Sequence, residues 1–441
     1  MSFQNALLAA ASVARPESLE SFQRQIPSEW IEQSLSATGT ATIRRRRLPA
    51  DQVVWLVIGI GLFRDRSIEE VVDALDIALP SPTGVVAKSA IPPARLRVGD
   101  APLRWLFERT SQAWSRASAE RHRWRGLAVY GMDGSSLRTA DTEKNRAEFG
   151  GWTAGKGDSS NPIVRVVVLM ALRSHLLAAA RFGSYAGTSE LALARELVED
   201  IPAHSLTILD ALYLSVAFLT ALEAGKPRHW LTKAKSNTKM RVLETFAEGD
   251  VLVEMRTTDE ARARDPLLPR TWQARAIHYQ RAGFPPRTLL TSLRDPHQYP
   301  AAEIRALYHE RWELELAYDE LKTEMLHAEV TLRSKSPTTV RQELWGVLIG
   351  FNLVRLEMER VAAEAKVAPT RISFVVSLAL IRDEWEWSAR TRSPGAIPKH
   401  LRSLRERLKR FVLPPRRPLR SYPREVKNDY RRYPRRKRSA K

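Results

Sequence analysis

Hydrophobic positions recur with helical spacing through the first quarter of the chain. An apolar stretch covers residues 51–63, and Ser67-Ile68-Glu69-Glu70 has the form of a capping box at a helix start. We therefore expect an N-terminal helical domain over residues 1–120. Its short helices and nearby arginines (44–47, 95 and 97) suit a helix-turn-helix DNA reader. A helical bundle without DNA contacts would show the same pattern, so both interpretations stay open.

After residue 125 apolar runs of strand length replace the helical spacing. The pattern predicts three strands, then helix, strand, helix and strand, at residues 127–132, 163–172, 176–182, 189–200, 206–209, 212–224 and 229–233. This order predicts an α/β fold with an RNase-H-like mixed sheet and flanking helices. We expect residues 125–233 to form the first part of this core.

Residues 234–300 interrupt that order. Valine-rich and alternating runs at 251–255, 271–279 and 287–292, separated by Gly and Pro, predict an all-β insertion. Helical spacing returns afterwards, and we expect residues 301–365 to supply the last helices of the core. Residues 366–441 are expected to form C-terminal helices and a basic tail.

Four polar residues share one edge of the helix predicted at 303–326, namely Tyr308, Arg311, Glu315 and Lys322. At about 100° per residue they fall within a stripe roughly 60° wide. Arg offers a bidentate fork to phosphate oxygens, Lys a point charge and Tyr a hydroxyl donor. The stripe indicates a surface that cuts nucleic acid. Spacing alone equally allows an Arg311–Glu315 ion pair on a solvated helix face.

Asp133 and Asp210 each follow a predicted strand. If the two strands are neighbours, their carboxylates meet at one edge of the sheet, and Glu315 on a packed helix would supply a third. Three hard oxygen ligands favour Mg²⁺, with Mn²⁺ as a substitute, over zinc. The plain structural alternatives are a turn at Asp133-Gly134 and a helix cap at Asp210.

The positive charge of the chain is concentrated at one end. Lys and Arg number 70 against 50 Asp and Glu, a net charge of +20. Residues 401–441 hold 17 of the positive and three of the negative charges, a local +14, with tyrosines between them. We expect an unfolded arm that follows a phosphate backbone, with a solubilising tail as the alternative.

Composition excludes several other classes. The chain has no cysteine, so disulfides, thiolate zinc sites and thiol catalysis are excluded. Its longest apolar run, residues 53–63, has eleven residues and is too short for a membrane helix. Residues 1–10 lack the features of a secretory signal. We expect a cytoplasmic protein without a membrane partner, and no ATP-binding or hydrolase-triad motif is present.

The segment from Tyr308 to Lys322, YHERWELELAYDELK, has the spacing Y-(2)-R-(3)-E-(6)-K. In this it resembles the large insertion-sequence-four family of bacterial DDE transposases. The segment DGSSLR at Asp133 and the segment LTILDALYLS around Asp210 are similar to the surroundings of that family's two aspartates. The resemblance spans residues 25–360. Family members usually have Arg-Gly or a similar pair after the second aspartate, where this chain has Ala211-Leu212.

The resemblance implies an RNase-H-like transposase. It implies three catalytic metal ligands, Asp133, Asp210 and Glu315. It also implies three residues that bind the transposon end, Tyr308, Arg311 and Lys322. The expected activity is Mg²⁺-dependent endonuclease and strand transfer by a homodimer on terminal inverted repeats and target DNA, at the bacterial nucleoid. The alternatives are a catalytically silent, domesticated DNA-binding protein and a metal-dependent nuclease without strand transfer.

Hairpin-forming members of the family stack a flipped base on an aromatic residue of the insertion. Trp230 and Trp272 are the tryptophans near that region. No spacing selects either one, and burial in the core is the more ordinary role for both.

Overall fold

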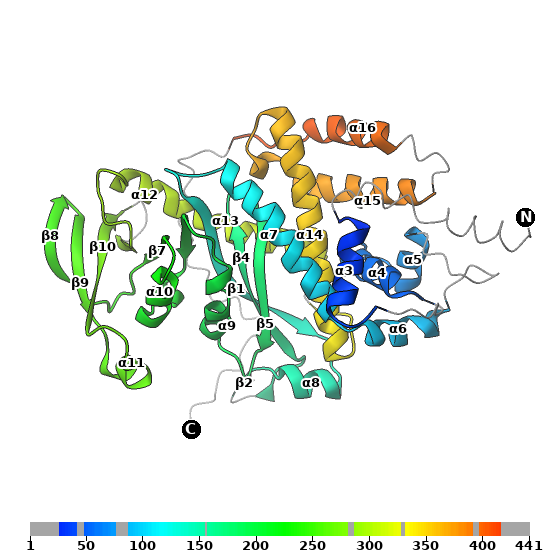
Figure 1. Cartoon of the computed structure of the whole chain (residues 1–441), viewed down its shortest axis with the longest axis horizontal. Helices are drawn as coiled ribbons and strands as arrows, with labels where there is room; N and C mark the ends of the chain where they lie inside the picture. The colour runs from blue at the N-terminus through cyan, green and yellow to red at the C-terminus, as the bar shows by residue number, and fades with distance from the viewer. Residues whose placement is uncertain are drawn as a thin grey trace, which may run out of the picture.

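The computed structural model describes residues 26–41, 48–75, 87–154, 157–280, 286–327, 331–390 and 397–415. The basic arm beyond residue 415 and the arginines at 44–47 lie outside the described residues. A large sheet occupies the middle of the molecule, with N-terminal and C-terminal helices gathered at one end and the insertion at the other (Figure 1).

One ten-stranded sheet forms the centre of the protein. Its strands are β1 (Ala128–Thr139), β4 (Ile163–Ala171), β5 (Leu176–Ser184), β6 (Ser205–Leu209), β7 (Arg228–Lys233), β8 (Arg241–Ala247), β9 (Asp250–Arg256), β10 (Thr271–Tyr279), β11 (Arg287–Thr291) and β12 (Thr331–Leu332). The first five are ordered β5-β4-β1-β6-β7, with β4 antiparallel to its neighbours and β6 parallel to β1 and β7. This arrangement confirms the predicted RNase-H-like α/β core.

The insertion extends the same sheet. Strands β11, β10, β9 and β8 continue it beyond β7, and the strands predicted at 251–255, 271–279 and 287–292 are confirmed as β9, β10 and β11. The segment also contains α11 (Asp259–Arg264), a short helix that the pattern did not predict. Thr258 caps it by accepting the Ala261 N–H at 3.2 Å.

Helices cover both faces of the sheet. Those before the insertion are α3 (Ser28–Ala37), α4 (Ala50–Leu62), α5 (Ile68–Ala74), α6 (Ile91–Val98), α7 (Ala101–Arg121), α8 (Glu143–Phe149), α9 (Glu190–Glu196) and α10 (Val216–Glu223). Those after it are α12 (Ala301–Tyr308), α13 (Trp312–Asp319), α14 (Pro337–Ala365), α15 (Phe374–Arg390) and α16 (Ile397–Lys409). α9 and α10 share a core with one face of the sheet, and α7, α13 and α14 share a core with the other.

The N-terminal helices pack directly on the part of the chain that follows the sheet. α4 is almost entirely buried and lies against the long helix α14. The contact brings backbones together, because a Cβ built at Gly61 would lie 2.7 Å from the Gly346 carbonyl carbon. The predicted capping box is confirmed at the start of α5, where the Ser67 N–H donates to the Glu70 carboxylate at 2.7 Å.

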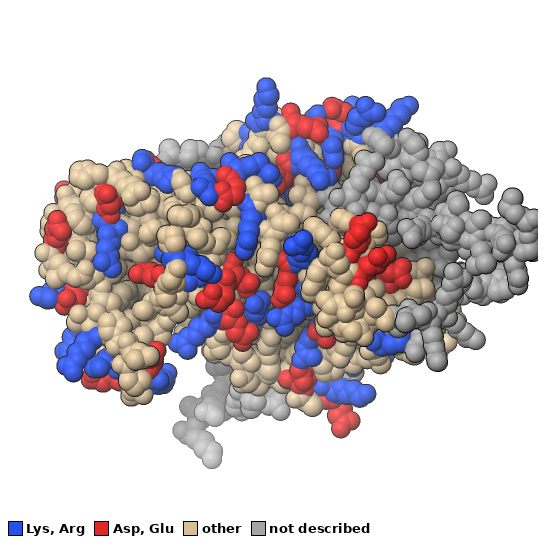
Figure 2. Space-filling view, viewed as in Figure 1, with Lys and Arg blue, Asp and Glu red and all other residues tan. Residues whose placement is uncertain are grey.

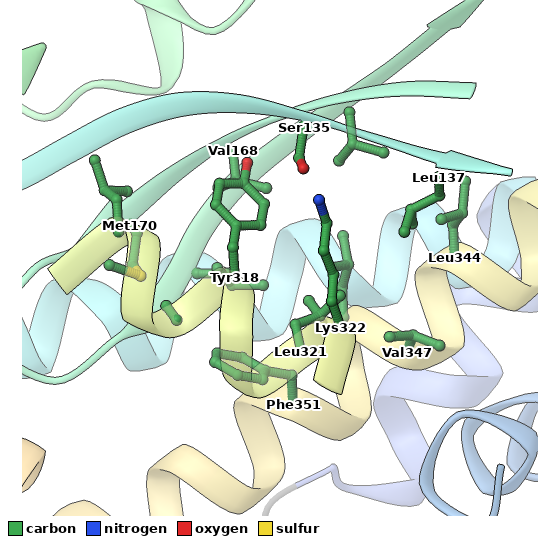
Figure 3. Close-up of a pocket in the computed structure, with 15 residues that line it drawn as sticks. Ser135, Leu137, Val168, Met170, Tyr318, Leu321, Lys322, Leu344, Val347 and Phe351 are labelled. Atoms are coloured by element: carbon green, nitrogen blue, oxygen red, sulfur yellow. The ribbon is translucent and has the colours of Figure 1, made fainter. Parts of the chain in front are cut away.

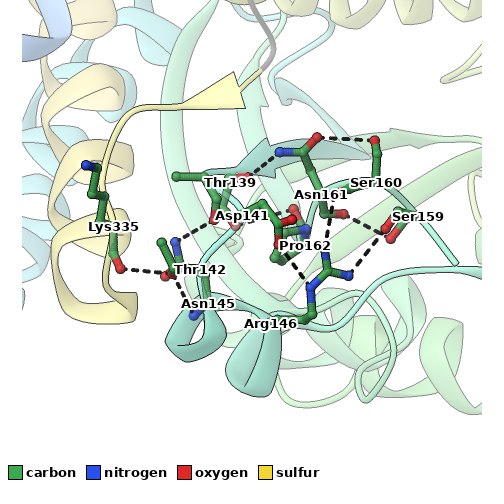
Figure 4. Close-up of polar contacts among 11 residues, drawn as sticks. Thr139, Asp141, Thr142, Asn145, Arg146, Ser159, Ser160, Asn161, Pro162 and Lys335 are labelled. Atoms are coloured by element: carbon green, nitrogen blue, oxygen red, sulfur yellow. Dashed lines mark hydrogen bonds and ion pairs between the residues drawn. The ribbon is translucent and has the colours of Figure 1, made fainter.

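Hydrogen bonds hold the segment that connects β1 to β4. This segment contains α8 and the small hairpin of β2 (Thr153–Ala154) and β3 (Gly157–Asp158). The Asn161 amide donates to the Thr139 carbonyl at 3.1 Å. The Thr142 hydroxyl donates to the Lys335 carbonyl at 3.0 Å and also caps α8 (Figure 4). These contacts fix the far end of β1 to the segment that leads into α14.

Among the described residues, no helix is long and apolar enough to cross a membrane.

Candidate active site

Asp133 and Asp210 lie side by side at one edge of the sheet. Met132 pairs with Leu209 in the parallel ladder between β1 and β6, and each aspartate is the next residue along. Asp210 ends its strand as predicted. The prediction that Asp133 also ends a strand is wrong, because β1 continues to pair with β4 as far as Arg138 after β6 has ended.

Each aspartate accepts the N–H of the residue that follows it. Asp133 Oδ1 accepts from Gly134 at 2.9 Å, and Asp210 Oδ1 accepts from Ala211, where a 3₁₀ turn (Ala211–Tyr213) begins. The helix-cap interpretation of Asp210 is therefore correct for this oxygen. A cap and a ligand are compatible, because a carboxylate has two oxygens and about four acceptor positions.

The surroundings of Asp133 disfavour its negative charge. Burial raises the pKa of its carboxyl to about 6, and the charges of Glu190 and Asp210 add to the rise. The Gly134 N–H and the Arg311 guanidinium oppose it. Carboxylates crowded in this way would be relieved by a bound cation.

The helix that carries the four-residue stripe is not uniform. After α12 comes a 3₁₀ turn at His309–Arg311, then α13, then a π-helical segment at Glu320–Met325. The expectation of one regular helix over 303–326 is wrong in this respect, so a constant 100° per residue does not place these side chains. π-helical segments are frequent at functional sites, and this one carries Lys322.

Arg311 lies between the aspartate edge and Glu315. Its guanidinium donates to Glu315 Oε1 at 2.7 Å, and the two side chains are 20% and 35% exposed. It also interacts with the charges of Tyr308 and Asp210. The ion pair allowed by the spacing is thus present, and its guanidinium interacts with the charge of Asp210.

Lys322, on the π-helical segment, interacts with the charge of Asp133. The neighbouring Tyr318 hydroxyl donates to the Asp133 carbonyl at 2.8 Å, and Lys322 Nζ lies 5.7 Å from the Tyr318 ring centre. Lys322 rises along an otherwise apolar pocket and points its amino group toward Ser135 on β1 (Figure 3). Burial lowers its pKa, and the charge of Asp133 opposes that change.

The three carboxylates are not assembled as a metal centre in this structure. Within the ranges that the structure describes, no three His, Asp or Glu side chains are grouped closely enough to hold a metal ion. Asp133 and Asp210 are neighbours, whereas Glu315 is paired with Arg311. The donor set still fits Mg²⁺ or Mn²⁺, since the ligands are hard carboxylate oxygens with unfavourably crowded charge.

Sequence reasoning missed Glu190 and Tyr213, which also reach this edge. The Tyr213 hydroxyl donates to Glu190 Oε1 at 2.7 Å, and Glu190 lies against Gly134. Of the two tryptophans considered for base stacking, Trp230 is fully buried and donates to Glu223, so it belongs to the core. Trp272, packed beside it, is partly exposed.

Charge on the visible face of the molecule is mixed. Lys and Arg gather over the end of the insertion near α11, whereas acidic side chains lie near the middle of this face (Figure 2). α11 contributes Arg262 and Arg264 to its last turn. This face is therefore not uniformly basic, and the sequence places most of the excess positive charge at residues 401–441.

Two protein families match consecutive parts of the chain. Residues 16–108 match the family described as insertion element 4 transposase N-terminal, and residues 124–353 match the transposase DDE domain. The transposase InsG for insertion sequence element IS4 of Escherichia coli is 38% identical over 418 residues, which cover 94% of this chain and 93% of InsG. A solved piggyBac transposase synaptic complex with hairpin DNA aligns at 11% identity with a TM-score of 0.43, over 91% of this chain and 86% of its own.

Proposed function

The chain belongs to the insertion element 4 family of DDE transposases, and we propose on this premise that it cuts and rejoins DNA at the ends of its own insertion sequence. The observation that carries this proposal is the register of Asp133 beside Asp210, with Arg311 and Glu315 on the adjacent helix. Acidic and basic groups are thus combined at one sheet edge, as phosphoryl transfer requires.

Asp133, Asp210 and Glu315 would hold divalent metal, Mg²⁺ or Mn²⁺. When bound, such ions activate the attacking oxygen and stabilise the leaving oxygen of an in-line displacement. Asp133 contributes a carboxylate whose charge is disfavoured by burial and by its acidic neighbours. The same crowding supports a role in binding a cation, because a cation lowers the free energy of the ionised carboxylates.

Tyr308, Arg311 and Lys322 would hold the phosphates of the transposon end. Arg311 is paired with Glu315 at 2.7 Å, so a phosphate that takes the guanidinium fork competes directly with that carboxylate. We expect end binding to release Glu315 from the pair and to make its oxygens available near Asp210. The end would then complete the site at which it is cut.

The wider assembly follows from the same proposal. The protein would act as a homodimer on terminal inverted repeats and target DNA, with strand transfer after cleavage. The N-terminal helices and the basic C-terminal arm would hold DNA away from the cut. We further propose that it works at the bacterial nucleoid.

The decisive experiment compares wild type with Glu315→Gln on labelled DNA that carries the native flanks of the gene. Cleavage is measured with Mg²⁺, with Mn²⁺ and with chelator, and binding to the same DNA is measured in parallel. Asp319→Asn is the matched control, because Asp319 is an exposed acid on the same helix that accepts from Thr323. We expect Glu315→Gln to abolish cutting and retain DNA binding, and Asp319→Asn to retain both.

Each result has a distinct meaning. Specific end binding without metal-dependent cutting by the wild type would favour a silent, domesticated DNA-binding protein. Cutting without joining to target DNA would favour a metal-dependent nuclease that lacks strand transfer. Equal loss of binding and cutting in Glu315→Gln would remove the assigned role of that carboxylate.

A further inference from the structure

Glu190 lies behind the strand that carries Asp133. Gly131 of β1 contacts Leu314 of α13, and because side chains alternate along a strand, Asp133 faces α13 and Gly134 faces the opposite side. Glu190, the first residue of α9, occupies the space next to Gly134: a Cβ built at position 134 would overlap its carboxyl carbon. The absence of a side chain at 134 therefore allows this carboxylate to touch the strand.

Tyr213 connects the same carboxylate to the second aspartate. Its hydroxyl is fully buried with the rest of the ring and donates to Glu190 Oε1 at 2.7 Å. Its backbone N–H donates to the Asp210 carbonyl at 3.1 Å. On the other side, the Gly134 N–H donates to Asp133 Oδ1 at 2.9 Å. A continuous chain of contacts therefore runs from one aspartate to the other through Glu190.

This chain of contacts begins where the backbone ladder stops. The register between β1 and β6 ends at the pair Met132 and Leu209. Beyond this pair the two strands diverge, since β1 continues along β4 while the other chain turns into a 3₁₀ helix. The aspartates lie one residue past the last pair, so their separation depends on contacts made by side chains.

We propose that Glu190 is a positioning residue of the active site, which sets the separation of Asp133 and Asp210 through Gly134 and Tyr213. This inference rests on the proposed function. Glu190 acts through its shape and its acceptor oxygen, and it touches neither the metal nor the DNA. Partners of this kind, one layer behind the ligands, typically change metal affinity or activity by about 10- to 100-fold when removed.

Three variants separate the shape and acceptor oxygen of the Glu190 side chain from its charge. Glu190→Gln keeps an oxygen that accepts the Tyr213 hydroxyl but removes the charge, whereas Glu190→Ala removes both. Tyr213→Phe removes the donor and leaves the ring in place. The matched control is Glu196→Ala, at the other end of α9, where the side chain is 57% exposed.

Two quantities are measured on the full-length protein. The first is Mn²⁺ affinity without DNA, from the paramagnetic resonance signal of free Mn²⁺. The second is the single-turnover rate of end cleavage, with thermal melting and end binding as controls for folding. We expect Glu190→Ala and Tyr213→Phe each to lose about 10- to 100-fold in both quantities. The double variant Glu190→Ala/Tyr213→Phe should lose no more than the more impaired of the two single variants. Glu190→Gln and Glu196→Ala should stay within about threefold of wild type in both quantities.

The outcomes distinguish this inference from the proposed function. A wild type that neither binds Mn²⁺ nor cuts would overturn the function and this inference with it. An active wild type with unchanged Glu190→Ala and Tyr213→Phe would overturn the positioning role alone. Losses in Glu190→Gln as large as those in Glu190→Ala would overturn it too, because charge and not position would then be decisive.

Discussion

Asp133 is the residue at which stability and function are most directly opposed. Its pKa is raised from 3.8 to about 6, so the folded state binds its proton more tightly than the unfolded chain does. The stabilisation from that proton is complete below pH 3.8 and is lost as the pH rises through 6. At neutral pH the ionised carboxylate therefore destabilises the metal-free protein.

Asp133→Asn is expected to raise the melting temperature of the metal-free protein at pH 7.5 and to change it little at pH 4. The pKa difference corresponds to roughly 3 kcal/mol at most, and partial exposure to water reduces this to about 1–2 kcal/mol. Thermal melting in chelator at both values of pH checks the expectation. A variant that is less stable than wild type by the same amount at both would contradict it.

The residues of the site divide by how far their roles depend on local sequence. Asp210 could be proposed from a short apolar run that ends in an acid, and Arg311 from its distance along the chain to Tyr308 and Glu315. Glu190 and Tyr213 could not, because their contact joins segments 23 residues apart along the chain. The role of Gly134 could not be predicted either. Only the packing of α9 against β1 shows that a side chain at position 134 would overlap Glu190.

At the scale of elements, strands with strong apolar runs were predicted closely, and β10 matches the predicted 271–279 at both ends. The predicted element bounds and types are wrong where contacts with a neighbouring element determine them. β1 extends past Asp133 because β4 continues to pair with it. The segment from α12 through Glu320–Met325 changes helix type three times, which apolar spacing does not reveal.

The packing of α4 on α14 gives a prediction at this scale. A Cβ built at Gly346 would overlap the Val57 carbonyl, and backbone cannot move aside as a side chain can. Gly346→Ala is expected to lower the free energy of unfolding by about 1–3 kcal/mol through overpacking, despite the better helix propensity of alanine. Urea unfolding of the full chain measures the change.

Gly350 supplies the control for that prediction. It lies one turn further along α14, and a Cβ there would meet Leu62 Cγ at 3.0 Å, which is a side-chain atom and not backbone. Gly350→Ala should therefore cost less than Gly346→Ala. Equal losses from the two substitutions would show that close backbone approach is not what fixes α4 on α14.

At the scale of the whole molecule, the N-terminal helices and the sheet share one hydrophobic core. Val54 and Phe63 of the first part and Val129 and Phe351 of the second all belong to it. Sequence patterns located these parts but gave no information on their contact, because the apolar face of a helix does not name its partner. The folding of the catalytic sheet is accordingly expected to depend on the N-terminal helices.

The distribution of charge gives the last prediction. Residues 416–441 contain 12 Lys and Arg against two acids, and the visible described surface is mixed. If this arm neutralises phosphates, deleting it should weaken binding to DNA of any sequence. It should also make the decline of log K with log salt shallower by roughly 0.9 for each phosphate that is no longer neutralised. Binding titrations across a range of salt concentrations measure that slope.

Two arm variants decide whether charge is the cause. A shuffled arm of the same composition should keep the slope of the wild type, because counterion release depends on charge and not on residue order. An arm of the same length with Lys and Arg replaced by Gln should behave like the deletion. If the deletion leaves the slope of log K against log salt unchanged, the arm only aids solubility. The contacts to phosphate must then come from the described core. Arg311 and Lys322 would then be the first residues to test for the remaining salt dependence.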